Sequence, residues 1–417
     1  MDKDVRAGAG TGPSPSAFAY VAFRLYWTAR FLNGFATQIV SVAVGWQIYD
    51  ETRDPFLLGL VGLVQFAPAL VFVLVTGSVA DRYNRRAVMA LCISLEALTV
   101  ATLAAFWMLH DASGPGHPVW PVFVILTFFG VARAFLTPAL QSLVANLVPR
   151  EVFANAVAWN SSSMQASFTV GPAVGGLLYG LSHLAAYGVA FVLFATAVVL
   201  VAFIPKPKQH TTSEPRTVES MLAGVRYIFS NPVVLGAISL DLFAVLLGGA
   251  TALLPVFARD ILEVGPLGLG LLRSAAGVGA LVMVFWLVRN PIHNHAGKIM
   301  FAGVAVYGLA IIVFGLSTTL WLSIPALFVM GAADMISVNI RSTLIQLATP
   351  DEVRGRVTAV NSVAIGASNE VGEFRAGTMA AFIGAVPAVV IGGAGTLIIT
   401  GLWTRLFPQL YARRKLT

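Results

Sequence analysis

The sequence predicts an all-α membrane protein whose twelve transmembrane helices form two pseudo-symmetric six-helix bundles. The first observation behind this fold class is composition: 57% of the 417 residues are hydrophobic and 11% are charged, whereas a soluble domain has about 25% charged residues. The second is that apolar runs long enough to cross a bilayer fill most of the chain. The third is a sequence repeat between the two halves. Little chain remains for an extramembrane domain, which excludes an appended enzyme or nucleic-acid-binding domain.

The spans are predicted from apolar runs bounded by charged residues or by Gly and Pro. Six precede a polar stretch and six follow it: 21–49, 56–80, 87–109, 120–147, 151–180 and 184–204, then 233–258, 266–289, 297–317, 320–348, 353–384 and 386–407. The predicted domains are a flexible cytoplasmic tail (1–20), an N-terminal bundle (21–204), a cytoplasmic linker (205–231), a C-terminal bundle (232–407) and a basic cytoplasmic tail (408–417).

Lys and Arg residues gather on one side of this topology. Nineteen lie at the termini and the even-numbered connections, against two, Arg53 and Arg259, on the opposite side. Positively charged loops are retained in the cytoplasm, so the sequence predicts a multi-pass protein of the bacterial inner membrane with both termini cytoplasmic. The net charge of +7 then faces anionic lipid headgroups, and no nucleic-acid partner is expected. We expect a monomer.

The two halves repeat one another in register. The segments 149–160 and 350–361 share Pro, Glu, Val and Asn at a constant offset of 201, which also pairs Gly130 with Gly331. Two bundles in the same orientation, related by an axis along the membrane normal, place a substrate path between them near the midplane.

The connection after the second span carries a specific motif, Gly-Ser-Val-Ala-Asp-Arg-Tyr-Asn-Arg-Arg at 77–86. It resembles the G-x-x-x-D-R-x-x-R-R/K signature of the major facilitator superfamily. The resemblance implies a cytoplasmic gate that latches the two halves in the outward-facing state, formed by Gly77, Asp81, Arg82, Arg85 and Arg86. The equivalent place in the second half, 288–293, lacks the acid and the arginine pair, so a latch there is expected to be weaker.

The fifth span contains Gly171, Pro172, Gly175 and Gly176, similar to the motif that marks exporters and antiporters in this superfamily. Gly and Pro let helices pack closely and bend. Arg133 in the fourth span resembles the arginine that the superfamily uses in proton transfer. The segments 43–47, 147–156 and 371–377 resemble the bacterial branch that contains the enterobactin exporter and its drug-efflux relatives.

Away from the span ends, ten charged residues lie inside the spans. The five bases are Arg30, Arg133, Arg273, Arg341 and Arg375, and the five acids are Glu96, Asp241, Asp334, Glu370 and Glu373. An unpaired charge at mid-bilayer costs about 2.5–3.5 kcal/mol, so the balanced numbers favour pairing. Pairs of this kind can be purely structural, and that interpretation stays open for each one.

Acids inside the spans are the candidates for proton coupling. Burial favours the neutral form of a carboxylate and a nearby arginine favours the charged form, so such a group can exchange a proton as the halves rock. Glu373 ranks first because it shares a small and polar stripe with Ser362, Gly366, Asn369 and Gly377; Glu370 lies on a different face. Asp241 and Asp334 follow.

The residues expected to line the substrate path are polar, charged or aromatic. They are Arg30, Asn33, Gln38, Trp46, Gln65, Arg133, Asn160, Gln165, Arg341, Asn361, Asn369 and Glu370. Ordinary interhelical hydrogen bonding is the alternative for each. The six histidines fall in loops or at span ends, Cys92 is the one cysteine, and no phosphate-binding G-x-x-x-x-G-K-[ST] occurs, so neither metal, cofactor nor direct use of ATP is expected.

The sequence therefore predicts a secondary active transporter, not an enzyme. It is expected to export small amphipathic or hydrophobic molecules, drug-like or siderophore-like, by alternating access with proton antiport. Two alternatives remain: an uptake permease or facilitator of a small solute, and a membrane sensor that does not transport.

Overall fold

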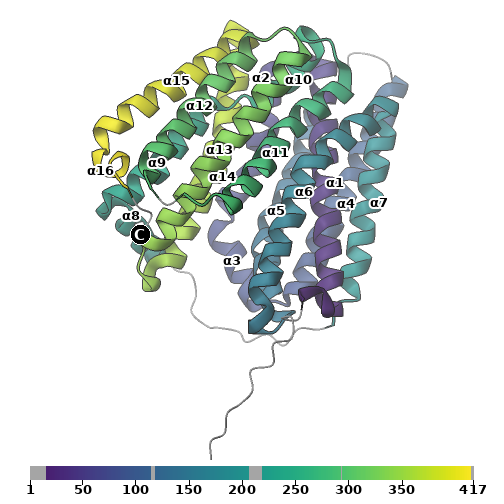
Figure 1. Cartoon of the computed structure of the whole chain (residues 1–417). Helices are drawn as coiled ribbons and strands as arrows, with labels where there is room; N and C mark the ends of the chain where they lie inside the picture. The colour runs from purple at the N-terminus through teal and green to yellow at the C-terminus, as the bar shows by residue number, and fades with distance from the viewer. Residues whose placement is uncertain (1–15, 114–117, 206–217, 293, 415–417) are drawn as a thin grey trace, which may run out of the picture.

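The computed structural model describes residues 16–113, 118–205, 218–292 and 294–414, and these residues form helices and short connections without strands (Figure 1). Most of the predicted N-terminal tail, residues 206–217 of the predicted linker and residues 415–417 lie outside this part of the chain.

The N-terminal half contains seven helices that make up six membrane spans, because the second span is divided at Phe72. They are α1 (Val21–Thr52), α2 (Pro55–Val71), α3 (Val73–Arg82), α4 (Arg85–Ser113), α5 (Trp120–Leu143), α6 (Phe153–Leu181) and α7 (His183–Ala202). Short 3-10 turns lie before α1 and between α5 and α6: η1 (Ala17–Ala19), η2 (Val144–Asn146) and η3 (Arg150–Val152).

The C-terminal half repeats this order after the connecting helix α8 (Val218–Ser230). Its seventh span is interrupted: α9 (Pro232–Gly248) is followed by η4 (Thr251–Leu253), α10 (Leu254–Val256) and a π-helical turn, η5 (Phe257–Ile261). The remaining helices are α11 (Gly265–Arg289), α12 (Ala296–Leu316), α13 (Leu320–Ala348), α14 (Asp351–Ile383), α15 (Ala385–Leu406) and the short α16 (Pro408–Tyr411).

Eight helices in the described part of the chain are both long and apolar enough to cross a membrane. The 17-residue α2 is apolar but shorter, and α1, α6 and α14, of 32, 29 and 33 residues, are long but more polar. Each of these four helices contacts the opposite half of the molecule. Helices that face protein or a cavity instead of lipid can carry more Gly, Ser and charge, which explains their lower hydropathy.

The two halves pack their helices in the same pattern. In the N-terminal half Gly130 of α5 lies against the backbone of Gln65 in α2, and in the C-terminal half Gly331 of α13 lies against the backbone of Ala276 in α11. Neither glycine has room for a Cβ atom. The repeat read from the sequence therefore corresponds to a repeated helix-packing contact.

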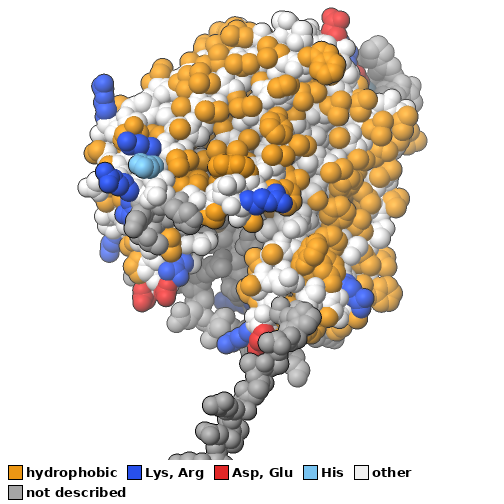
Figure 2. Space-filling model, in the orientation of Figure 1, with side chains coloured by type: hydrophobic (Ala, Val, Ile, Leu, Met, Phe, Trp, Pro, Cys, Tyr) orange, Lys and Arg blue, Asp and Glu red, His pale blue; other side chains and the backbone are white. Residues whose placement is uncertain are grey.

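Successive spans alternate in direction, so the molecule has two ends. We call the end that carries residues 16 and 414 the terminal face and the opposite end the distal face. Figure 2 shows hydrophobic side chains over the flanks of both halves, with most visible Lys and Arg side chains near α8, α16 and the bottom of the view, where the terminal face lies.

Two helix pairs join the halves, α6 with α11 and α2 with α14. In the first pair Gly176 lies against Pro266 and Gly270, and Gly270 lies against the carbonyl of Pro172. In the second, Gly377 of α14 approaches the backbone of α2 at Pro55. These close backbone contacts lie in the distal parts of the helices, so the halves meet most tightly toward the distal face.

Candidate transport cavity

A cavity of about 510 Å³ lies between the two halves. Its walls come from α2, α3 and α5 on one side and from α14 on the other. It is lined by Gln65, Phe66, Ala69, Leu70, Val73, Thr76, Gly77, Gly130, Arg133, Ala134, Thr137, Pro138, Gln141, Gly355, Thr358, Ala359, Ser362, Val363, Gly366 and Glu370. Sites for small molecules commonly have volumes of about 300–1,000 Å³ and mostly apolar walls with a few polar groups, and this cavity fits that description.

The cavity runs toward the terminal face. Its inner end lies at Gly130 and Glu370 near the middle of their helices, and its outer end lies at Gly77, Gln141 and Gly355, close to the helix ends on the terminal face. Toward the distal face the two helix seams close the space between the halves. In this structure the cavity is therefore open at the terminal face and closed at the distal face.

Two acids of α14 meet the N-terminal half at Gly62 of α2. A Cβ atom on Gly62 would clash with Oε2 of Glu370 and would lie 3.5 Å from Oε2 of Glu373. Glu370 lines the cavity. The sequence analysis assigned these acids to different faces of the helix, but three residues span less than one turn and both side chains reach the same glycine.

Arg133 lines the cavity from α5 and has acids on both sides. It interacts electrostatically with Glu96 of its own half and with Glu370 of the opposite half. Glu96 is fully buried, and Asn33 of α1 donates a hydrogen bond from Nδ2 to its Oε2. Arg133 thus stands between one acid inside its bundle and one across the interface.

Arg273 of α11 also reaches across the interface. Its guanidinium donates a hydrogen bond of 2.8 Å to Oγ of Ser41 in α1 and interacts electrostatically with Glu373. Glu373 therefore has a cationic neighbour of its own, on the distal side of the cavity.

A second polar cluster lies inside the C-terminal half. Arg341 of α13 forms an ion pair with Asp241 of α9, and both side chains are less than 10% exposed. Asp241 and Asp334 line a void of about 10 Å³ together with Tyr307 and Ser337. A void of about this size holds at most one water molecule, so the cluster is separate from the large cavity and serves no bulky ligand.

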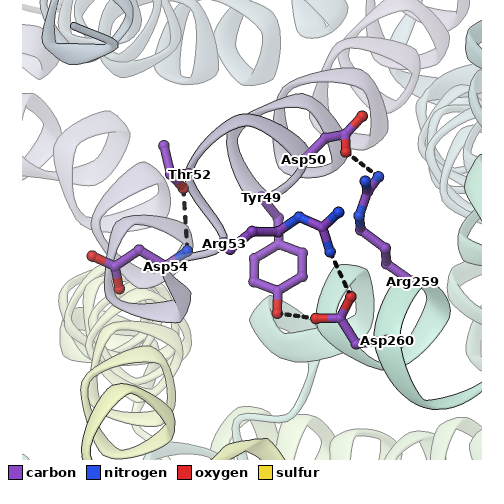
Figure 3. A network of polar contacts seen from close by, with 7 residues as sticks. All are labelled: Tyr49, Asp50, Thr52, Arg53, Asp54, Arg259 and Asp260. Atoms are coloured by element: carbon purple, nitrogen blue, oxygen red, sulfur yellow. Dashed lines mark hydrogen bonds and ion pairs between the residues drawn. The ribbon is translucent and has the colours of Figure 1, made fainter. Parts of the chain in front are cut away.

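The ends of α1 and η5 form a polar network on the distal face (Figure 3). Arg53 donates a hydrogen bond of 2.8 Å to Oδ1 of Asp260, and Tyr49 donates its hydroxyl to Oδ2 of the same carboxylate. Arg259 forms an ion pair with Asp50. The carbon at the centre of its guanidinium group lies 5.6 Å from the centroid of the Trp46 ring. Each half contributes one acid and one arginine, so two ion pairs cross the interface.

The remaining predicted path residues lie outside the cavity lining. Arg30 donates to the Tyr26 hydroxyl, Gln165 bonds to Thr169 of its own helix and to the carbonyl of Gly277, and Gln38 packs on Gly171. Asn160 and Asn361 each have a buried amide oxygen without a partner in the described part of the chain, and Asn369 is exposed. The prediction that these residues contact substrate stays a prediction.

The motif predicted to form the cytoplasmic gate lies at the terminal face. Arg85 donates to Oδ1 of Asn146 at 2.7 Å, Arg86 donates to the carbonyl of Ile204, and Arg82 is exposed. The side chain of Asp81 lies outside what the structure describes. The hydrogen bonds described for Arg85 and Arg86 stay within the N-terminal half, and the role of this motif as a gate stays a prediction.

The sequence analysis missed two features that the structure assembles. Glu96 was counted among the intramembrane acids without a role, because its partner Asn33 is 63 residues away. Asp50 and Asp260 lie just beyond the predicted spans 21–49 and 233–258, and no role was predicted for them. The sequence did contain a signal for the network of Asp50 and Asp260. Arg53 and Arg259 lie on the distal side, whereas the other nineteen loop and terminal Lys and Arg residues lie on the side of the termini.

Twelve spans in two pseudo-symmetric halves around a central cavity define a membrane transporter. The chain belongs to the Major Facilitator Superfamily, whose profile matches residues 26–373. The predicted fold and superfamily are thereby confirmed.

Relatives of this chain include efflux proteins with known roles. Macrolide efflux protein A of Streptococcus pyogenes is 25% identical over 354 residues, which cover 80% of this chain and 83% of that protein. The enterobactin exporter of Shigella boydii is 25% identical over 342 residues, 81% of this chain and 80% of the exporter. The resemblance to the branch of enterobactin and drug exporters is confirmed, and these relatives are transporters, not enzymes.

Solved structures share the fold at lower sequence identity. A bacterial homologue of the human lysosomal transporter Spinster, in an inward-facing and occupied conformation, has a TM-score of 0.75 at 14% identity and covers 96% of this chain and 99% of its own. A bacterial homologue of the iron transporter ferroportin, in an inward-facing state, has a TM-score of 0.69 at 14% identity over 94% of this chain and 99% of its own.

Proposed function

We propose that this chain is an exporter that moves small amphipathic or hydrophobic molecules across the bacterial inner membrane by alternating access, in exchange for protons. The observation that carries the proposal is the cavity between the halves, with its wall of apolar and polar side chains and with Glu370 at its inner end. Loading from the terminal face is the first step of the cycle. Closure there and opening of the distal face release the substrate on the other side.

The direction follows from which face is cytoplasmic. Lys and Arg residues concentrate at the terminal face, and positive segments are retained in the cytoplasm, so we infer that the cavity takes molecules from the cytoplasm. The same charge bias supports cytoplasmic termini and anionic lipids as neighbours of the basic loops. The efflux relatives support export over uptake.

Proton coupling is assigned to the acid pair of α14. Glu370 and Glu373 both reach Gly62 of the N-terminal half, and two like charges this close disfavour simultaneous ionisation. One proton held by the pair and exchanged when the halves separate supplies the coupling. Asp241 is already paired with Arg341, which favours a structural role for it.

Proteoliposomes test the proposal. A radiolabelled macrolide should accumulate against its gradient when an inward-directed proton gradient drives the wild-type protein. Glu373→Gln should still bind the macrolide but should not accumulate it, because removing the charge of Glu373 removes the like-charge repulsion that keeps a proton on the acid pair. Glu352→Gln is the matched control, since Glu352 is an exposed acid of the same helix outside the cavity lining.

The outcomes separate the alternatives. Macrolide flux that does not depend on the proton gradient indicates a facilitator or another coupling ion. Binding without any flux indicates a sensor. Normal accumulation by both Glu373→Gln and Glu370→Gln would remove the acid pair from the coupling mechanism.

A further inference from the structure

We propose that the cavity selects amphipathic molecules that carry one positive charge, and that Glu370 is the group that pairs with this charge. The proposal rests on the proposed function, because it assigns a substrate class to the same cavity. It goes beyond that function by deciding between cationic and anionic cargo, since the cavity lining contains both a base and an acid, Arg133 and Glu370.

The charges around the cavity do not cancel. Pairwise electrostatic interactions link five charged residues in a chain that runs from Glu96 through Arg133, Glu370 and Glu373 to Arg273. With all five ionised, this group has a net charge of −1. Inside a membrane an uncompensated charge is costly, so the group favours either a bound proton or a bound cation.

Arg133 has an acidic neighbour, Glu96, within its own half. Glu96 is 0% exposed and accepts one hydrogen bond, from Asn33, at Oε2. Its other oxygen, Oε1, has no partner among the described residues. A buried carboxylate in this position needs a nearby positive charge, and Arg133 on the adjacent helix α5 supplies it. The negative charge of Glu96 reduces the attraction of Arg133 for an anionic cargo.

Glu370 is the acid with the least compensation. Glu373, three residues further along α14, has Arg273 as its cationic neighbour, whereas Glu370 shares Arg133 with Glu96. The negative charge of Glu373 beside it further disfavours a bare carboxylate at Glu370. Since Glu370 lies on the cavity lining, a positively charged group of the cargo can reach it and restore neutrality.

The rest of the lining suits the remainder of such a molecule. Phe66, Leu70, Val73 and Val363 provide apolar surface, and the polar groups that accompany them are mostly uncharged hydroxyl and amide side chains. A lipophilic body is buried favourably against this wall. One positive charge on a lipophilic body is therefore the chemistry that the cavity recognises.

Pairing at Glu370 also links the cargo to the proton. Before loading, Glu370 holds a proton as a neutral carboxylic acid; on loading, the O–H bond breaks, the proton passes to water at the terminal face, and the carboxylate pairs with the cation. Charge is conserved, since one positive charge leaves as another arrives. Cargo binding should therefore strengthen as pH rises, and this dependence should vanish in Glu370→Gln.

Tetraphenylphosphonium and tetraphenylborate provide the decisive comparison, because they share size and shape and differ in the sign of their charge. We expect the purified protein in detergent to bind the phosphonium at least about tenfold more tightly than the borate, a difference of about 1.4 kcal/mol. Glu370→Gln should bring the two affinities within about threefold of each other. Glu370→Asp, which keeps the carboxylate, and the control Glu352→Gln should retain the preference.

Several results would overturn the proposal. Tighter binding of the borate would make Arg133 the recognition group and the cargo an anion. Equal binding of both ions, binding of neither, or a preference unchanged in Glu370→Gln would equally reject it. Thermal unfolding of each variant checks that the fold is intact. Charge-selective binding without proton-driven flux of the macrolide would reject the exporter proposal and leave the charge selectivity standing, so the two failures are distinguishable.

Discussion

Charged side chains inside the spans differ in the partners that neutralise or bind them. We use this difference to separate residues with a structural role from residues with a role in transport. Arg341 and Asp241 form a closed pair with each other. Arg375 donates from Nε to the carbonyl of Leu246 at 2.9 Å, and from a terminal nitrogen to the carbonyl of Leu247. These two carbonyls lie where α9 ends, so Arg375 satisfies backbone groups that the interrupted helix leaves free. Glu370, in contrast, has no dedicated partner.

The Asp241–Arg341 pair allows a test at the level of single residues. Arg341→Met leaves the buried carboxylate of Asp241 without its cation, and breaking such a pair costs about 3–5 kcal/mol. We expect a large fall in thermal stability in detergent. The double variant Asp241→Leu with Arg341→Met should recover most of this loss, because both charges are removed together. A double variant no more stable than the single one would show that the pair is not the reason for the loss.

The sequence predicted which charged residues matter better than it predicted their partners. It selected Arg133, Glu370 and Glu373 from their residue type and depth in the spans. It included Glu370 among the residues expected to line the substrate path, but it could not bring this side chain together with Glu373, because that depends on how α2 packs against α14 at Gly62. The role of Glu96 was invisible for the same reason, since its neighbours come from α1 and α5.

At the scale of elements, the glycine contact between α6 and α11 sets how closely the halves approach. Gly176→Leu places a side chain against the backbone at Pro266 and Gly270, where no Cβ atom fits. We expect the variant to favour the state open at the distal face. Gly180→Leu on the same helix is the control, because a Cβ atom there meets nothing within 4 Å.

Double electron–electron resonance measures this change as the distance between spin labels on Leu184→Cys and Phe382→Cys. Both positions are exposed and lie near the distal face, one in each half. The distance should lengthen in Gly176→Leu and stay at the wild-type value in Gly180→Leu. Identical distances in both variants would mean that the seam does not limit the approach of the halves.

The distal network of α1 and η5 makes a separate prediction. The side chains of its two ion pairs are 25–51% exposed, and pairs of this kind contribute about 0–1 kcal/mol each. Asp50→Asn should therefore raise the distal-open population by up to about fivefold. Glu51→Gln neutralises the adjacent exposed acid, for which no ion pair is described, and should leave the population unchanged. An equal response of both variants would assign the effect to net charge, not to the pair with Arg259.

The helices themselves were predicted closely, and the interruptions were not. Hydrophobic run lengths place α4, α7 and α12 within a few residues, since each is a long apolar segment between charged or Gly/Pro boundaries. At the break between α9 and η4, the carbonyls of Leu246 and Leu247 accept hydrogen bonds from Arg375 of the separate helix α14. Periodicity along one segment carries no information about such a contact.

At the scale of the whole molecule, the two faces are closed by different means. The terminal face has the arginine-rich motif of one half, and the distal face has two ion pairs in which both halves take part. Among the contacts described, the ion pairs of the distal network join the two halves, whereas the hydrogen bonds of the terminal motif stay within the N-terminal half. We infer a resting state that binds cargo from the terminal side. Occupancy of the cavity then has to supply the free energy that opens the distal network.

The orientation of the whole chain decides whether this cycle exports or imports, and single cysteines can establish it. In a Cys92→Ala background, Gln409→Cys lies at the terminal face and Glu51→Cys at the distal face, and both side chains are exposed. Because 19 Lys and Arg residues lie on the side of the termini against two on the other, the positive-inside rule predicts a cytoplasmic terminal face. A membrane-impermeant maleimide applied to intact spheroplasts should therefore label Glu51→Cys and should label Gln409→Cys only after permeabilisation. The reverse pattern would make the observed cavity open to the periplasm, and the same geometry would then describe an uptake system.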